Sequence, residues 1–232
     1  MSDQPGGPIP NQPLRFYWVL DVSGSMWGAK IGALNHAVRE ALPAMRQAAA
    51  DNAHAGVEVR VMAFGTGARW LTSAAVPLAS FSWSDVGVDG LTDMGAAMQA
   101  LAADLAAGNM PDRALPPVIV LVSDGQPTDD FAGGLRALMD EPWGSKAVRV
   151  AVAIGDADHD VLRRFVGDPA IEVLTARNPQ DLVAYVRWAS TEVLRAAAAP
   201  AGGPEATSQV APTATTTLPR PPAGGPATEV VW

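Results

Sequence analysis

The 232-residue sequence contains no cysteine, so it can form neither a disulfide framework nor a cysteine-based zinc site. Its hydrophobic runs are far shorter than the roughly 20 residues that a membrane-spanning helix needs. The first 13 residues contain no basic region and no apolar run, so they do not have the pattern of a secretion signal. From these absences we expect a soluble, cytoplasmic protein.

Positive charge is also scarce. The chain has 16 Lys and Arg against 24 Asp and Glu, which gives a formal net charge of −8 at pH 7. Nucleic acids bind basic surfaces, so this balance argues against a nucleic-acid partner. The sequence also lacks the Gly-x-x-x-x-Gly-Lys-[Ser/Thr] loop of nucleotide hydrolases and the Gly-x-Ser-x-Gly nucleophile elbow. We therefore do not expect an enzyme.

Hydrophobic periodicity predicts strands that alternate with helices along most of the chain. The expected strands are 14–20, 57–64, a short edge strand within 68–81, 117–123, 147–154 and 170–175. The expected helices are 31–45, 92–107, 130–140, 158–166 and 179–198. Such alternation predicts an α/β fold with a mostly parallel six-stranded sheet and helices on both faces. Pro43 is expected to kink or divide its helix, and Pro77 is unfavourable in a central strand.

Composition divides the chain into one folded domain and two tails. We expect residues 1–13 to be a disordered N-terminal segment, residues 14–197 to form the domain, and residues 198–232 to be a disordered tail rich in Pro, Ala and Thr. The tail has few bulky apolar residues, so burial would not offset the entropy lost on ordering it. It nevertheless finishes in Val-Val-Trp232, which is typical of a short recognition peptide.

The most informative motif follows directly on the first expected strand. Asp21, Ser23 and Ser25 are spaced by two, and a glycine between the serines permits a tight turn in which their oxygens converge. Oxygen ligands of this kind suit Mg²⁺ or Mn²⁺. Thr92 opens a helix and Asp124 ends a strand, so both are expected at the same edge of a parallel sheet. Each residue also has a local alternative, as a helix cap or a turn residue.

The combination of Asp21-x-Ser23-x-Ser25, Thr92 and Asp124-Gly125 resembles the metal-ion-dependent adhesion site (MIDAS) of von Willebrand factor type A (VWA) domains. The resemblance covers residues 13–197 and implies a Rossmann-like, doubly wound sheet. Within that family, the sequence around the two aspartates looks like the bacterial TerY-type branch, which is associated with tellurium resistance. Many relatives in that branch carry a cysteine-rich zinc ribbon after this domain, and this chain cannot form one.

The resemblance implies a protein-binding adaptor. Its metal ligands would be Asp21, Ser23, Ser25, Thr92 and Asp124, the ion Mg²⁺ or Mn²⁺, and an Asp or Glu of a partner protein would complete the coordination. The TerY-type resemblance implies a bacterial stress-response or phospho-signalling system with a Ser/Thr kinase and a phosphatase. Two alternatives stay open. One is an adaptor of an AAA-type ATPase, and the other is a Mg²⁺-dependent phosphoacceptor or hydrolase, for which a second acidic residue beside Asp21 is missing.

A kinase partner would find accessible threonines in the tail. Thr228 and Thr207 each have a valine three places later, a form that phosphothreonine-binding forkhead-associated domains often favour. A phosphate would add close to two negative charges and three acceptor oxygens for such a domain. These two threonines are therefore the candidate phosphorylation sites.

Other residues near the motif have simpler interpretations. The acidic segment around Asp158 lacks the Gly and Glu that an EF-hand loop requires, so Asp158 is expected to cap a helix. Asp129 and Asp130 are also expected to cap a helix, at the rim of the site. Trp27 and Met94 flank the motif, either as core residues or as apolar contacts for a partner.

Overall fold

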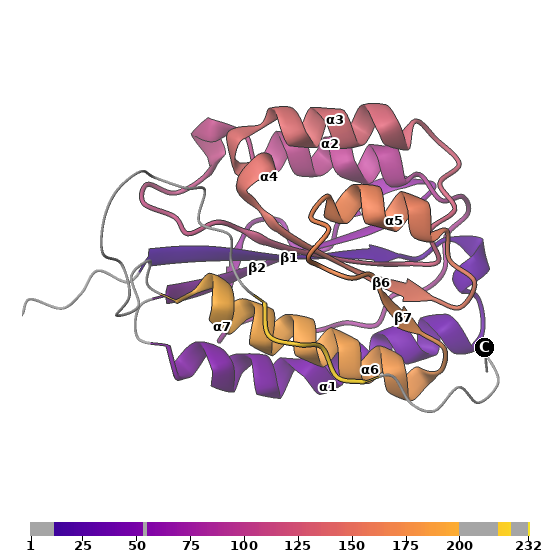
Figure 1. Cartoon of the computed structure of the whole chain (residues 1–232), viewed down its shortest axis with the longest axis horizontal. Coiled ribbons are helices and arrows are strands. Elements are labelled where there is room, and N and C mark those ends of the chain that lie inside the picture. Colours follow the sequence, from indigo (N-terminus) through magenta and orange to yellow (C-terminus); the bar gives the residue numbers. More distant parts are fainter. Residues whose placement is uncertain (1–11, 53–54, 200–217, 224–231) are drawn as a thin grey trace, which may run out of the picture.

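The computed structural model describes residues 12–52, 55–199, 218–223 and 232 (Figure 1). It confirms the predicted α/β fold, because these residues form a central, mostly parallel sheet with the strand order β3-β2-β1-β5-β6-β7. The strands are β1 (Gln12–Asp21), β2 (Ala55–Gly65), β3 (Gly67–Trp70), β4 (Val76–Pro77), β5 (Val118–Ser123), β6 (Val148–Ile154) and β7 (Leu174–Ala176). Only β3 and β4, which both pair with β2, run antiparallel.

Helices cover both faces of the sheet, as Figure 1 shows. On one face lie α1 (Ala29–Ala50), α6 (Pro179–Trp188) and α7 (Leu194–Ala197), with the π-helical turn Ala189–Val193 between the last two. On the other face lie α2 (Met94–Asp104), α3 (Phe131–Asp140), α4 (Pro142–Lys146) and α5 (His159–Val166). Short 3₁₀ turns at Gly24–Met26 and Ala107–Asn109 complete the elements.

Alternating side chains of the strands build two separate cores. In β1, Phe16, Trp18 and Leu20 pack on the α1–α6 face, whereas Tyr17 and Val19 pack on the α2–α3 face. The same period of two runs through β5 and β6. Strands buried on both faces have continuous apolar sequences, and it is this pattern that made them recognisable.

The order of the strands creates a switch point at the centre of the sheet. From β1 the chain crosses through α1 to β2 on one side, and later returns through α2 to β5 on the other side. In open α/β sheets, ligands bind at the carboxyl ends of the strands beside such a point. Asp21 is the last residue of β1 and Asp124 directly follows β5. The fold therefore places the two aspartates of the motif at the position where a ligand site is expected.

Several local predictions need correction. Pro43 lies within α1, a continuous 22-residue helix, so it does not divide that helix. The strand expected at 170–175 is shorter and later, because β7 spans only Leu174–Ala176. The helix expected over 179–198 is interrupted by the π-helical turn. Pro77 does lie in a short antiparallel strand at the side of β2, as its missing amide requires.

The described part of the C-terminal segment lies against the domain. Leu218 and Trp232 pack on the core of the α1–α6 face, which composition alone did not indicate. Residues 200–217 and 224–231 lie outside the described residues. Within the described parts of the chain, no helix has both the length and the apolar content needed to cross a bilayer.

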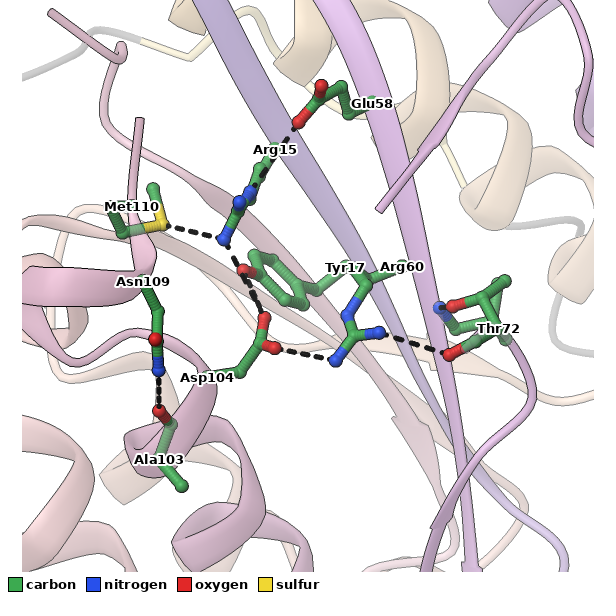
Figure 2. Close-up of polar contacts among 10 residues, drawn as sticks. Arg15, Tyr17, Glu58, Arg60, Thr72, Ala103, Asp104, Asn109 and Met110 are labelled. Carbon is green, nitrogen blue, oxygen red and sulfur yellow. Dashed lines mark hydrogen bonds and ion pairs between the residues drawn. The ribbon is translucent and has the colours of Figure 1, made fainter. Parts of the chain in front are cut away.

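A buried polar network fastens α2 to the sheet (Figure 2). The hydroxyl of Tyr17 donates to Asp104 Oδ2 over 2.8 Å, and Arg60 Nη2 donates to Asp104 Oδ1 over 2.5 Å. A second donor of the Arg60 guanidinium binds the carbonyl of Thr72 at 3.0 Å, and Arg60 Cζ lies 4.0 Å from the centre of the Trp70 ring. Because Asp104 is the last residue of α2, the network fixes the end of the helix that begins beside Thr92.

This environment predicts unusual tyrosine titration. Burial, followed by the charge of Asp104, raises the pKa of Tyr17, and burial followed by the charge of Asp181 raises the pKa of Tyr185. These are the only two tyrosines in the sequence. We expect the folded protein to show less tyrosinate absorbance than the unfolded protein near pH 10, where a free tyrosine is about half ionised. The control is the same protein unfolded in guanidinium, which should titrate normally.

The raised tyrosine pKa values also make the stability of the fold depend on pH. The folded pKa lies above the unfolded one, so the stabilisation contributed by the neutral phenols is present below about pH 10 and is lost as the pH rises further. Equal tyrosinate absorbance of the folded and the unfolded protein at pH 10 would contradict the raised pKa of Tyr17 and Tyr185.

Candidate metal centre

The loop after β1 brings the first three motif residues together. Asp21 is fully buried, and its Oδ1 accepts a hydrogen bond of 2.8 Å from the backbone amide of Ser23. The hydroxyls of Ser23 and Ser25 lie 3.0 Å apart, because the 3₁₀ turn Gly24–Met26 folds the second serine over the first. The local spacing of two residues thus becomes one cluster of oxygens at the carboxyl end of β1.

The loop after β5 supplies the second carboxylate. Ser123 donates its hydroxyl to Asp21 Oδ2 at 2.6 Å and accepts the amide of Gly125 at 2.8 Å, so it joins the two loops. Asp124 Oδ2 lies 3.4 Å from Lys30 Nζ. Its other oxygen, Oδ1, is buried and has no hydrogen-bond partner within the described residues. A buried carboxylate oxygen without a donor is costly, and a cation would satisfy it.

Thr92 reaches the site on the long connection between β4 and α2. This connection is held by its backbone, since Asp89 N donates to Val22 O at 2.6 Å and Gly24 N donates to Gly90 O at 2.9 Å. Next to it, Thr92 N donates to Thr128 Oγ1 at 3.1 Å, and Thr128 N donates to Thr92 O at 2.9 Å. Three loops are therefore joined around one point.

The motif residues open on a shared pocket. Ser25, Thr92 and Asp124 line an open pocket of about 560 Å³, and Asp21 and Ser23 lie directly beneath it through the contacts given above. Among the described residues, there is no group of three or more His, Asp or Glu side chains of metal-binding geometry. An ion here would depend on two carboxylates and three hydroxyls, an oxygen-only set that fits a hard divalent cation.

The electrostatics of the site favour a bound cation. Burial raises the pKa of Asp21, and the charge of Asp124 adds to this rise, whereas hydrogen bonds from Ser123 and Ser23 oppose it. A divalent ion would stabilise both charged carboxylates at once. Lys30 Nζ is a positive group that lies beside Asp124.

Three neighbouring contacts were not predicted from the sequence. Ser123 is the last residue of β5 and Lys30 lies in the first turn of α1, and neither belongs to the motif. Asp129 does cap a helix, but not the one that follows it, because its two oxygens each accept an amide of α2, Gly95 N and Ala96 N, at 2.8 Å. No local sequence signal marks such a contact, since the partners are more than 30 residues away.

Other expectations can be compared directly with the structure. Asp130 caps α3 by accepting the amide of Gly133, and Asp158 caps α5 by accepting the amides of Asp160 and Val161. Both predictions are confirmed. Met94 is fully buried in the core. Trp27 is 78% exposed, so core packing is wrong for this residue. Thr207 and Thr228 lie outside the described residues, and their phosphorylation stays a prediction.

The bridge made by Asp129 yields a measurable prediction. Replacing Asp129 with alanine should lower the free energy of unfolding by about 1–2 kcal/mol, because two amides at the start of α2 lose their charged acceptor. Urea unfolding measures this loss. The matched control is Asp112→Ala, which removes an exposed aspartate elsewhere and should change stability by less than about 0.5 kcal/mol. Equal stability of the two variants would contradict a capping role.

A family model described as von Willebrand factor type A domain matches residues 16–126 of this chain. The matched region contains all five predicted ligands. No curated protein is significantly similar to the chain in sequence.

Solved structures show the same fold at low sequence identity. The pilus adhesin SpaC from Lactobacillus rhamnosus GG is 15% identical with a TM-score of 0.62, covering 80% of this chain and 31% of SpaC. The ArnB paralog VWA2 from Sulfolobus acidocaldarius is 16% identical with a TM-score of 0.54, covering 76% and 45%. Proximal thread matrix protein 1 of the mussel byssus, solved with zinc in its MIDAS motif, is 13% identical with a TM-score of 0.59, covering 80% and 48%. The chain thus spans less than half the length of each of these proteins.

Proposed function

We propose that this chain is a metal-dependent protein-binding adaptor rather than an enzyme, since a von Willebrand factor type A model matches residues 16–126, which include all five expected ligands. The observation that carries the proposal is the unpartnered, buried Oδ1 of Asp124, which lies in the same pocket as Ser25 and Thr92. Proteins of this class generally bind other proteins through such a site. The zinc-occupied site of the mussel protein supports a divalent cation in this fold.

The five expected ligands would contribute differently to the binding of an ion. Asp21 is set by Ser23 and Ser123, so it presents a fixed negative charge at the floor of the site. Ser23 and Ser25 add neutral oxygens, and Thr92 and Asp124 close the site from the other two loops. A bound Mg²⁺ or Mn²⁺ would supply an electrophilic position at which an Asp or Glu oxygen of a partner can bind.

The surface around the pocket suits a protein partner. Trp27 and Leu91 are 78% and 55% exposed. Leu91 lines the pocket, and Trp27 follows Ser25 by two residues on a different loop. Exposed tryptophans are enriched at the centres of protein interfaces. We propose that these two side chains make the apolar part of the contact, while the ion makes the polar part.

The proposed cellular setting follows from the TerY-type resemblance of the motif. We place the adaptor in the bacterial cytoplasm, in a stress-response or phospho-signalling system with a Ser/Thr kinase and a phosphatase. An adaptor of an AAA-type ATPase is the alternative, and both settings use the same site. A Mg²⁺-dependent phosphoacceptor is less well supported, since no second acidic residue follows Asp21 at the end of β1, and the two Asp21 oxygens accept the Ser23 amide and the Ser123 hydroxyl.

A pull-down tests the proposal. Tagged protein should retain its partner in Mg²⁺ and lose it in EDTA, and Asp21→Ala should lose it in both, because each change removes the bridge to the partner's carboxylate. Asp156→Ala is the matched control, because Asp156 lines the same pocket but is not an expected ligand, and it should retain the partner. Identification of the retained protein as a kinase, phosphatase or hexameric ATPase separates the settings. Equal retention of the partner by wild type and Asp21→Ala in Mg²⁺ would contradict the proposed metal bridge.

A further inference from the structure

The indole of Trp232 lies in the candidate metal pocket of its own chain. Trp232 lines this pocket together with Ser25, Thr92 and Asp124, although it is more than 100 residues away from each of them in the sequence. It is partly buried and packs against the core of the α1–α6 face. Figure 1 marks it at the carboxyl end of the sheet, near the start of α1.

The indole lies against Gly155, where the absence of a side chain leaves space for it. This residue follows β6 directly, has a φ of +61°, and donates its amide to Ala176 O at 3.1 Å. A Cβ placed on Gly155 would lie 3.3 Å from Trp232 Cδ1 and 3.8 Å from Lys30 Cε. The indole therefore lies against the bare backbone of Gly155, next to the aliphatic stem of the lysine whose ammonium group approaches Asp124.

The preceding described piece of the segment leads toward this pocket. Leu218 lies near Trp188 at the end of α6, and Ala223 lies near Arg177 and Asp181 at its start. The piece, drawn in yellow in Figure 1, thus runs antiparallel to α6 toward the carboxyl end of the sheet. Nine residue steps separate Ala223 from Trp232, enough for a reach of about 30 Å at ~3.3–3.6 Å per residue.

The contact of Trp232 with the pocket leaves one polar atom of the indole without a partner among the described residues. Trp232 Nε1 is buried without a hydrogen-bond partner in the part of the chain that the structure describes. A buried donor left unpaired costs free energy, which offsets part of the gain from burying the ring. The indole is therefore suited to leave the pocket when another group offers a better contact.

We propose that the Gly155 and Lys30 wall of the pocket is an aromatic-binding subsite, and that Trp232 fills it in cis so that a partner must displace it. The displacement rests on the proposed function, whereas the subsite itself does not. A tethered residue competes at an effective concentration on the order of millimolar, so a partner meets a pocket that is already occupied. A partner segment with an aromatic side chain near its metal-binding carboxylate would displace the Trp232 indole from the subsite and bind the ion at the same time.

Fluorine NMR of the full chain labelled with 5-fluorotryptophan tests the subsite without any metal. The chain has seven tryptophans, and the signals of Trp232 and Trp27 are assigned with Trp232→Phe and Trp27→Phe. The Trp232 signal should differ from its position in guanidinium and should move in Gly155→Ala. Gly67→Ala is the matched control, because Gly67 also has a positive φ of +73° but no atom within 4 Å of the added Cβ. A Trp232 signal at its denatured position, or one that moves equally in both variants, would overturn the proposal.

Adding Mn²⁺ then separates this inference from the proposed function. Paramagnetic broadening falls steeply with distance, and Trp27 follows Ser25 by two residues, so it reports on the metal alone. Broadening of both signals supports the metal site and the cis contact. Broadening of Trp27 with a sharp Trp232 overturns the cis contact and leaves the metal site. If neither signal broadens, the metal site is wrong, and the Gly155→Ala result alone decides the subsite.

Discussion

Asp21→Ala is expected to lower the affinity of the chain for Mg²⁺ or Mn²⁺ by at least roughly 100-fold. Asp21 supplies a charge at the floor of the site, and its two oxygens also position Ser23 and Ser123. The variant therefore loses a ligand and the hydrogen bonds that orient two loops. Isothermal titration calorimetry with each ion measures the loss.

The matched control for this variant is Asp156→Ala, which removes the same charge from the wall of the same pocket. It should change metal affinity by only a few fold, since screening in an open pocket weakens a charge that makes no bond to the ion. Comparable losses in the two variants would mean that the pocket attracts cations only by its overall charge. The stability of both variants should also be measured by urea unfolding without metal. This is needed because Asp21→Ala leaves the Ser23 amide and the Ser123 hydroxyl without their acceptor.

The second large effect is expected from Gly65→Ala, at the end of β2. A Cβ on this residue would lie 2.0 Å from the carbonyl oxygen of Asp89, and backbone cannot rotate away as a side chain can. We expect a loss of about 1–3 kcal/mol in the free energy of unfolding. The connection that carries Thr92 must also shift, because Asp93 N donates to Gly65 O at 2.9 Å. Metal affinity should therefore fall along with stability.

Gly87→Ala is the appropriate comparison, because it lies in the same connection and its added Cβ would have no atom within 4 Å. Urea unfolding and Mn²⁺ titration of both variants measure the two effects. If Gly65→Ala lost stability but bound metal as well as Gly87→Ala, Thr92 would not depend on the position of this connection.

Much of this architecture was predictable because its signals are local. The apolar runs of β1, β5 and β6 are long enough to mark strands buried on both faces, and Asp21-x-Ser23-x-Ser25 is a pattern within five residues. The parallel order of the sheet then brings Asp124 to the same edge. Asp158 was identified as a cap for the same reason, since it binds amides two and three residues ahead.

What sequence reasoning missed depends on contacts between distant segments. Ser123 and Asp21 are 102 residues apart, and Lys30 and Asp124 are 94 apart, so periodicity carries no information about either pair. Pro43 was expected to disturb its helix, yet α1 stays continuous, because packing against α6 and the sheet outweighs a local preference. Trp232 was expected to seek a groove on another protein, and only the three-dimensional path of the chain shows that its own pocket is within reach.

The backbone bonds that join the three loops have an evolutionary consequence. Gly24, Asp89 and Thr128 hold their neighbours through main-chain amides, which any residue except proline provides. The exposed side chains above them, such as Trp27 and Leu91, can therefore be exchanged by mutation while the arrangement beneath stays intact. A scaffold of this kind lets descendants of one gene acquire new binding preferences step by step, without having to rebuild the metal position each time.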